Sequence, residues 1–362
     1  MWYETSLTKK LNIKLPIIQA GMAGGPTTPE LVATVSNQGA LGTLGAGYMT
    51  PEDMRTAIHN IRRLTDQPFA VNIFIPEPVE LEEQKVFEMS HTLQPFYEEL
   101  GIKQPTLPPE WGAQFEQQMK VIIEEKVPVF SFTFGILDLH WVKQLKANGT
   151  KVIGTATTVK EAQLLEEIYV DAIVAQGSEA GGHRGTFSCQ AEDAMIGTIA
   201  LVPQMVDSVN VPVIAAGGIM DGRGLLASLS LGASGVQMGT VFLPAIESGA
   251  NPVYKKSLMK ATEEDTTVTV KFSGKAARGL KNAFIARLSD VSDIQVPNYP
   301  IQNALTQPLR KEAAKQGKAE WLSMWAGQGL RLAQSEGAGQ IIHRVMEQAS
   351  HTLQKLKNIE KD

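Results

Sequence analysis

The stretch 211-VPVIAAGGIMDGRGLLASLSLGASGVQMG-239 is the clearest guide to the fold class. Its first apolar run, 211-VPVIAA-216, is followed by adjacent glycines, then by helical spacing over residues 222–232, and then by a second run, 234-SGVQMG-239. Runs of this kind are typical of parallel strands that are covered on both faces. The stretch therefore predicts a strand, a covering helix and a second, parallel strand.

The same alternation recurs through the preceding part of the chain. Six further runs read as strands: 15-LPIIQA-20, 40-ALGTL-44, 69-FAVNIF-74, 127-VPVFSF-132, 151-KVIGTA-156 and 170-VDAIVA-175. Segments with helical spacing lie between the runs, at residues 29–38, 51–64, 137–149, 158–168 and 193–207. Eight strand–helix units over roughly 240 residues favour an α/β fold of the (β/α)8 TIM-barrel type over an open, doubly wound sheet.

Two segments do not fit the repeat. Residues 76–126 are charged and helical in spacing, and residues 251–362 are again mainly helical, with one candidate strand at 266-TTVTVKF-272. The connection over 76–126 is far longer than an ordinary strand–helix loop. We expect a barrel formed by residues 1–75 and 127–250, and a smaller, mainly helical lid or substrate subdomain formed by residues 76–126 and 251–362.

Composition limits the classes of partner. The 362 residues carry a formal net charge of −5, which provides no general basic field for nucleic acid or anionic lipid. No apolar run is long enough for a membrane span, and the N-terminus lacks the order of a signal peptide. With Cys189 as the single cysteine, a reducing compartment is the simplest expectation. We expect a cytoplasmic monomer or homodimer that binds a small molecule, and no paired histidine and carboxylate spacing indicates a metal.

The ends of the last two strands predict a phosphate site. Gly217 and Gly218 follow one strand, and Gly239 lies in 237-QMGT-240 at the end of the next. Glycines here let the backbone approach a ligand closely and turn its N–H groups toward an anion. The loops after strands seven and eight are the recurring phosphate site of TIM barrels. Asp221 is expected to cap the following helix instead of contacting the phosphate.

Polar and polarizable side chains at other strand ends predict contacts with a flat ring. Asn72 is an amide inside an apolar strand, and Gln176 closes another strand, so each amide could hydrogen-bond a heterocycle or pair with backbone. Met22 could contact a ring through its sulfur or pack in the core.

The segment 176-QGSEAGGHRG-185 combines four glycines, Gly181 among them, with one histidine. Removing side chains from a loop at a catalytic strand end makes room for a planar ligand and a substrate. His183 is then the group that can exchange a proton near neutral pH. The alternative is a solvated imidazole beside Arg184 as a surface charge.

At this point the chain resembles a known family. The motifs QAGMAGG, VNIF, GSEAGGHRG, AAGGIMDGRG and QMGT, over about residues 15–245, resemble in order and spacing the bacterial class I nitronate monooxygenases, formerly called 2-nitropropane dioxygenases. The resemblance implies a TIM barrel with a lid and non-covalently bound FMN. It implies His183 as the active-site base, and FMN contacts from Asn72, Gln176, Gly181, Gly217, Gly218, Gln237, Met238, Gly239 and Thr240. Tyr299, in the segment 298-NYPIQNALTQPL-309, is a candidate substrate contact from the lid or a packing residue.

The implied reaction is oxidation of an alkyl nitronate by O2 to a carbonyl compound and nitrite, with detoxification of propionate 3-nitronate as the role. His183 would abstract the α-proton of a neutral nitroalkane, or bind the anion as an imidazolium. The alternative enzyme is an FMN-dependent enoyl-acyl-carrier-protein reductase that uses NAD(P)H. A non-catalytic flavin-binding protein would keep the glycines and have no use for His183.

Overall fold

The computed structural model describes residues 1–107, 112 and 114–359. Eight parallel strands form its central sheet: β1 (Ile17–Gln19), β2 (Gly42–Gly45), β3 (Phe69–Phe74), β4 (Val129–Thr133), β5 (Lys151–Ala156), β6 (Ala172–Gln176), β8 (Val213–Ala216) and β9 (Gly235–Met238). Their order is β1-β9-β8-β6-β5-β4-β3-β2. A parallel bridge between Ile18 and Leu41 brings the two ends of this order together. The predicted TIM barrel is thus confirmed, and all eight predicted strands form it.

Helices surround the barrel: α2 (Pro29–Asn37), α3 (Pro51–Leu64), α5 (Phe115–Glu124), α6 (Leu139–Ala147), α7 (Val159–Glu167), α8 (Thr198–Val206) and α9 (Gly222–Ser230). Thr28, Thr50 and Thr158 cap three of them by accepting a backbone N–H at the helix start. Each hydroxyl satisfies an amide that has no partner inside its own helix. These local signals explain why the predicted starts of these three helices match the structure. α8, predicted from residue 193, begins only at Thr198, where Gly197 provides no side-chain cap.

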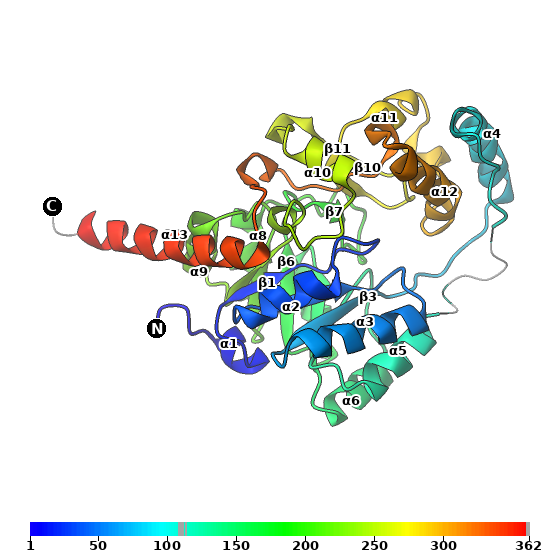
Figure 1. Cartoon of the computed structure of the whole chain (residues 1–362). Coiled ribbons are helices and arrows are strands. Elements are labelled where there is room, and N and C mark those ends of the chain that lie inside the picture. Colours follow the sequence, from blue (N-terminus) through cyan, green and yellow to red (C-terminus); the bar gives the residue numbers. More distant parts are fainter. Residues whose placement is uncertain (108–111, 113, 360–362) are drawn as a thin grey trace.

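Two apolar layers hold the barrel together. Ile18, Val129 and Ile214 belong to a cluster inside it, which α1 (Ser6–Leu11) joins through Leu7 and Leu11. A much larger cluster lies between the strands and the surrounding helices. The interior is therefore a packed core, and α1 lies at the end of the barrel opposite the lid (Figure 1).

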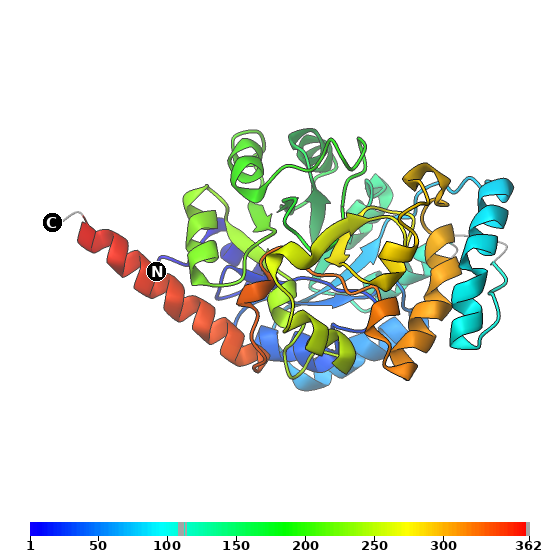
Figure 2. The same cartoon turned by 90° about the horizontal axis from the view of Figure 1, so that it is seen from above.

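The elements α4, α10–α12, β10 and β11 gather over the other end of the barrel, as Figures 1 and 2 show. They are α4 (Glu83–Leu100), α10 (Pro252–Leu258), β10 (Thr266–Thr269), β11 (Ala277–Leu280), α11 (Ala283–Arg287) and α12 (Ile301–Gln316). The 3-10 turns are η1 (Thr240–Phe242), η2 (Glu263–Asp265), η3 (Asp293–Gln295), η4 (Ala319–Trp321) and η5 (Leu330–Leu332). α4 packs against α12 although residues 101–300 separate them in the sequence. We refer to α4 together with residues 252–332, which carry α10–α12, β10 and β11, as the lid.

Two helices from the non-repeating segments pack on the barrel side. α5 contacts α3 and α6, and the last helix, α13 (Ala338–Ile359), contacts α9 and α2. Figure 1 shows α13 beside α9, with its C-terminal turns extending away from the body. The division of the chain at residues 75, 127 and 250 stays a prediction. Among the described residues, no helix has the length and apolar character needed to cross a membrane.

The lid contains a small antiparallel sheet that reaches the barrel. β10 pairs with β11, and β11 pairs with the two-residue strand β7 (Gly182–His183). The candidate strand at 266–272 is confirmed over its first four residues. β7 and β11 were not predicted, because their short, glycine-containing sequences become strands only through pairing across the fold.

Candidate active site

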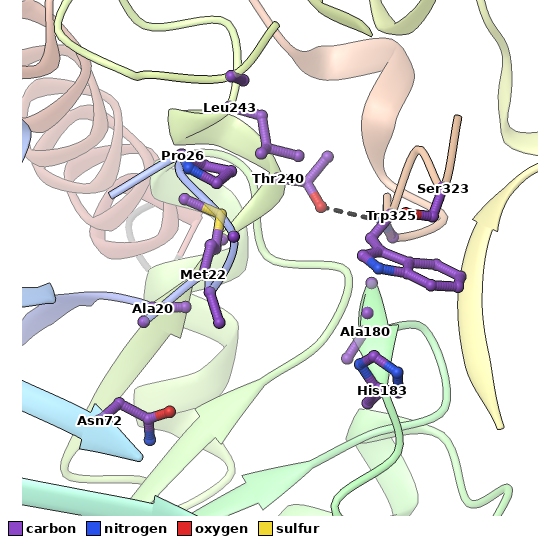
Figure 3. A pocket seen from close by; sticks show the side chains of 18 of the residues that line it. Ala20, Met22, Pro26, Asn72, Ala180, His183, Thr240, Leu243, Ser323 and Trp325 are labelled. Atoms are coloured by element: carbon purple, nitrogen blue, oxygen red, sulfur yellow. Dashed lines mark hydrogen bonds between the residues drawn. The ribbon is translucent and has the colours of Figure 1, made fainter. Parts of the chain in front are cut away.

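A cavity of about 560 Å³ lies at the carboxyl ends of the barrel strands, beneath the lid. It is lined by most of the residues singled out in the sequence: Met22, Asn72, Gln176, Gly181, His183, Gly217, Gly218, Gln237, Gly239 and Thr240. Figure 3 shows Met22 and Asn72 along one side, and Ala180, His183 and Trp325 along the other. A space between two such walls suits a flat ligand.

Met238 and Tyr299 do not line this cavity. Successive residues of a strand point to opposite faces, so Gln237 faces the cavity while the side chain of Met238 is buried in the core. The backbone carbonyl of Met238 accepts a hydrogen bond from Ala20 N (2.9 Å). The ring of Tyr299 lies 6.1 Å from the imidazole of His183, measured between centroids.

The glycines after β8 have the backbone geometry that the sequence analysis required. Gly217 has φ +119° and Gly218 φ +72°, a region that side-chain-bearing residues rarely adopt. Asp221 caps α9, as predicted, by accepting hydrogen bonds from the backbone N–H groups of Arg223 (3.0 Å) and Gly224 (3.2 Å). The lid reaches this end of the cavity, because Gly327 N donates to Thr240 Oγ1 (2.9 Å; Figure 3).

The amide of Gln176 organises the histidine loop. Its Nε2 donates to the carbonyl of His183 (3.0 Å), and its Oε1 accepts from Gly185 N (2.8 Å). Asn72 behaves differently: Nδ2 donates to Ser131 Oγ (2.9 Å), while its Oδ1 has no protein donor within the described chain. The side-chain oxygen of Asn72 therefore offers a hydrogen-bond acceptor at the cavity wall.

Arg184 is not a surface charge. Its side chain is 1% exposed, and Nη1 donates to Gly177 O (2.6 Å) while Nη2 donates to Gln176 O and Ala194 O (both 3.0 Å). The alternation of a short strand turns Arg184 inward when His183 faces the cavity. Burial, with Arg278 nearby, lowers the pKa of Arg184 to about 10. The guanidinium thus ties the loop to the end of β6.

His183 is held by the lid sheet as well as by its own loop. It pairs with Ala277 of β11, and its imidazole lies 5.3 Å from the Trp325 ring and 5.8 Å from the Phe134 ring, between centroids. Burial, together with the charges of Lys275 and Arg310, lowers the pKa of His183 to about 3. The imidazole is therefore neutral at physiological pH and can accept a proton.

Ser273 contacts the Nε2 atom of the imidazole. Its hydroxyl lies 2.9 Å from His183 Nε2 and 3.1 Å from Lys275 O, so its single hydrogen can serve either atom. When the hydrogen is donated to Lys275 O, Nε2–H donates to Ser273 and Nδ1 is the unprotonated nitrogen; when it is donated to Nε2, Nδ1 carries the ring proton. Ser273 is fully buried, so water does not compete for the contact.

Several residues around the cavity were missed in the sequence. Tyr48 follows β2 and Phe134 follows β4, and the others come from the lid: Tyr254, Ser273, Asn303, Arg310 and Trp325. Only Phe134 carries a local mark, its positive φ of 78°, and backbone dihedrals are not legible in a sequence. The remainder are placed by tertiary packing.

These features together define an α/β-barrel enzyme whose cavity, at the carboxyl ends of the strands, is lined by glycines and by a neutral imidazole. The family model for nitronate monooxygenase matches residues 4–348, and the chain belongs to this family of flavin-dependent oxidoreductases. The family predicted from the five motifs is therefore confirmed.

Relatives match nearly the whole chain. The probable nitronate monooxygenase of Staphylococcus saprophyticus subsp. saprophyticus is 49% identical over 355 residues, 98% of this chain and 99% of the relative. The probable nitronate monooxygenase of Staphylococcus aureus strain Newman is 47% identical over the same shares.

Solved structures share the architecture. The nitroalkane oxidase from Streptomyces ansochromogenes has a TM-score of 0.91 at 38% identity, over 97% of this chain and 99% of that chain. FabK from Thermotoga maritima has a TM-score of 0.77 at 34% identity, over 98% and 99%. Of these two structures, the nitroalkane oxidase has both the higher TM-score and the higher sequence identity.

Proposed function

We propose that this enzyme uses FMN and O2 to oxidise alkyl nitronates to a carbonyl compound and nitrite, with propionate 3-nitronate as its substrate and detoxification as its role. The observation that carries the proposal is a neutral His183 at the wall of a cavity whose opposite wall is formed by Met22 and Asn72. A base in that position can act on the carbon next to a nitro group. We also propose that the enzyme is located in the cytoplasm and binds neither nucleic acid nor membranes.

The residues present fit a flavin mononucleotide. The cavity volume of about 560 Å³ falls within the usual range for cofactor sites. Gly239 lines the cavity beside the wall that Met22 forms: a Cβ atom there would lie 3.5 Å from Ala20 Cβ and 3.8 Å from Met22 Sδ. The hydrogen bond between Gly327 and Thr240 ties the lid to the phosphate end, which favours a mononucleotide that ends there over a dinucleotide.

We assign the cofactor contacts as follows. Gly217, Gly218, Gly239 and Thr240 would hold the phosphate through backbone and hydroxyl groups, and Asn72 Oδ1 would accept from a ring N–H. Met22, Gln176, Gly181, Gln237 and the backbone of Met238 complete the set. The bound flavin supplies the capacity to accept electrons from the nitronate and to pass them to O2.

The protein's own contribution is acid–base and positional. Nδ1 of His183 accepts the α-proton when the substrate is a neutral nitroalkane, in the tautomer whose Nε2–H donates to Ser273 Oγ while the Ser273 hydroxyl donates to Lys275 O. The low pKa keeps the ring neutral before the substrate binds. This favours the base over the imidazolium alternative in the ligand-free site. Trp325 and Phe134 flank the ring. Tyr299, close to the same imidazole, is proposed to contact the substrate.

Nitrite release under air, measured with short alkyl nitronates, tests the proposal. We expect nitrite and O2 consumption with nitronates, and no oxidation of NADPH in the presence of an enoyl thioester. His183→Asn should slow turnover of a neutral nitroalkane by about 100-fold or more while FMN stays bound. Enoyl-thioester reduction without nitrite would instead establish the reductase, and an unchanged rate in His183→Asn would favour a flavin-binding protein without this base.

A further inference from the structure

Arg310 places an uncompensated positive charge at the cavity. It lies on α12 of the lid and lines the cavity at the C-terminal end of the barrel. Its hydrogen bonds all go to neutral acceptors: Asn303 O (3.1 Å), Asn303 Oδ1 (2.6 Å), Thr306 O (3.4 Å) and Ser323 Oγ (3.3 Å). These contacts fix the orientation of the guanidinium without neutralising it.

Within the described residues, no carboxylate lies within 4.0 Å of the Arg310 guanidinium. Burial lowers the pKa of Arg310, the effect expected when a cation is removed from water without a counter-charge. Arginine nevertheless stays protonated in proteins, so the charge persists. Nη1 carries two N–H groups and donates one of them, to Ser323, which leaves a donor for a ligand.

The other cation near the imidazole is already paired. Lys275 and Arg310 are the two charges that lower the pKa of His183, so both lie close enough to act on it. Lys275 Nζ forms an ion pair with Glu77 Oε1 at 2.7 Å. Arg310 is thus the cation of the two that can receive an anionic ligand.

Two phenols lie near Arg310, and the one that lines the cavity, Tyr48, accepts a hydrogen bond from the other, Tyr299, so the hydrogen of Tyr48 is the one open to a ligand. Burial raises the pKa of both Tyr48 and Tyr299, so both phenols stay protonated at neutral pH. Tyr48 also lines the cavity, and each phenol interacts with the charge of Arg310. A cation flanked by neutral hydroxyls matches the hydrogen-bonding needs of a carboxylate, which a planar guanidinium can bind through two parallel N–H groups.

We propose that Arg310 binds a carboxylate carried by the substrate at the end away from the nitronate carbon, and so selects carboxylated nitronates over purely alkyl ones. This rests on the proposed function. The flavin phosphate is a poor candidate for the same cation, because the phosphate glycines follow β8 and β9 whereas Tyr48 follows β2, three and two strands away around the barrel. A substrate held by His183 at one end and by Arg310 at the other would be fixed in orientation.

The test compares two nitronates of equal chain length in the FMN-loaded enzyme, that of 3-nitropropionate and that of 1-nitropropane. Arg310→Gln should lower kcat/KM for the carboxylated nitronate by about 10- to 100-fold, mainly through KM, since a charged hydrogen-bonding partner is lost. The loss with the alkyl nitronate should be about threefold or less. Arg310→Lys should restore part of the preference for the carboxylated nitronate. Lys315→Gln, at the exposed end of α12, should leave kcat/KM for both nitronates unchanged.

A binding measurement separates this inference from the proposed function. Succinate, a dicarboxylate that does not react, should perturb the flavin spectrum of the wild-type enzyme without O2, at concentrations about tenfold lower than in Arg310→Gln. Equal losses for both nitronates, with equal succinate affinity, would show that Arg310 does not recognise a carboxylate. If the wild-type enzyme oxidises neither nitronate, the proposed function fails, and the succinate titration alone then decides the role of Arg310.

Discussion

At the level of single residues, the site combines a neutral imidazole with cations that act on it. His183 is partly accessible to the cavity but enclosed by aromatic rings, and Ser273 contacts its Nε2. Its position is therefore fixed by partners from the lid as much as by its own loop. Two predictions concern single residues, His183 and Gly218.

The first prediction concerns acid stability. With a pKa of about 3 in the folded enzyme, against about 6.5 when unfolded, His183 binds its proton more readily in the unfolded chain between those values. Stability should therefore fall as pH drops from 7 to 5, by at most about 2 kcal/mol from this group. Denaturant unfolding of the wild-type enzyme and of His183→Gln at pH 7 and pH 5 measures this loss of stability.

The variant should lose less stability on acidification than the wild-type enzyme. His351→Gln, which alters an exposed imidazole, serves as the control and should behave as wild type. The same pH dependence in His183→Gln and wild type would contradict the low pKa.

The second prediction concerns Gly218. Valine there should reduce FMN affinity by about tenfold or more, because the φ of +72° is strained for valine and its Cβ would already lie 3.4 Å from Glu179 Cβ, so the loop must shift. Gly149→Val is the matched control, since Gly149 also has a positive φ (+81°) but lies in an exposed turn with open space around it. Comparable FMN affinity in the two variants, by fluorescence titration, would count against the phosphate site.

At the level of helices and strands, the packing of α13 on α9 depends on a glycine. A Cβ atom at Gly222 would lie 2.1 Å from Ala349 N and 2.4 Å from Val345 O, so the two helices contact each other through their backbones at this point. Such close approach requires a residue without a side chain. The helix that begins at the predicted phosphate loop is thereby fixed from behind by the C-terminal helix.

We therefore expect Gly222→Val to lower the free energy of unfolding by about 1–3 kcal/mol, because α13 must move away or the helices must strain. Ala227→Val, on the exposed face of α9, introduces the same β-branched side chain without the clash and should cost much less. Denaturant midpoints of the two variants provide the comparison. Equal midpoints would mean that α13 adapts freely.

At the level of the whole molecule, the barrel and the lid meet at the ligand site, with β7 of the barrel loop paired to β11 of the lid. A ligand that contacts both parts should stabilise the folded enzyme as a unit. Whether the molecule is a monomer or a homodimer stays a prediction, which light scattering on the purified enzyme can resolve.

We predict that FMN at 100 times its Kd stabilises the apoprotein by about 2.7 kcal/mol, seen as a rise in Tm. Riboflavin, which lacks the phosphate, should raise Tm less at equal concentration. In Gly218→Val this advantage of FMN over riboflavin should shrink. An equal rise with both flavins would argue against a phosphate site at Gly217, Gly218 and Gly239, and mass analysis of heat-released flavin would identify the natural cofactor.

By itself, the sequence determined the eight barrel strands, the capped helix starts, the glycine loops and the candidate base, because apolar runs, caps and glycine pairs are local patterns. Tertiary structure alone decided the pairing of β7 with β11, the contact between His183 and Ser273, the inward turn of Arg184 and the placement of Arg310 at the cavity. Ser273 lies 90 residues from His183, and the low pKa of that imidazole arises from burial by segments distant in the chain. Such properties depend on what surrounds a residue in space, and residue type and spacing do not encode that surrounding directly.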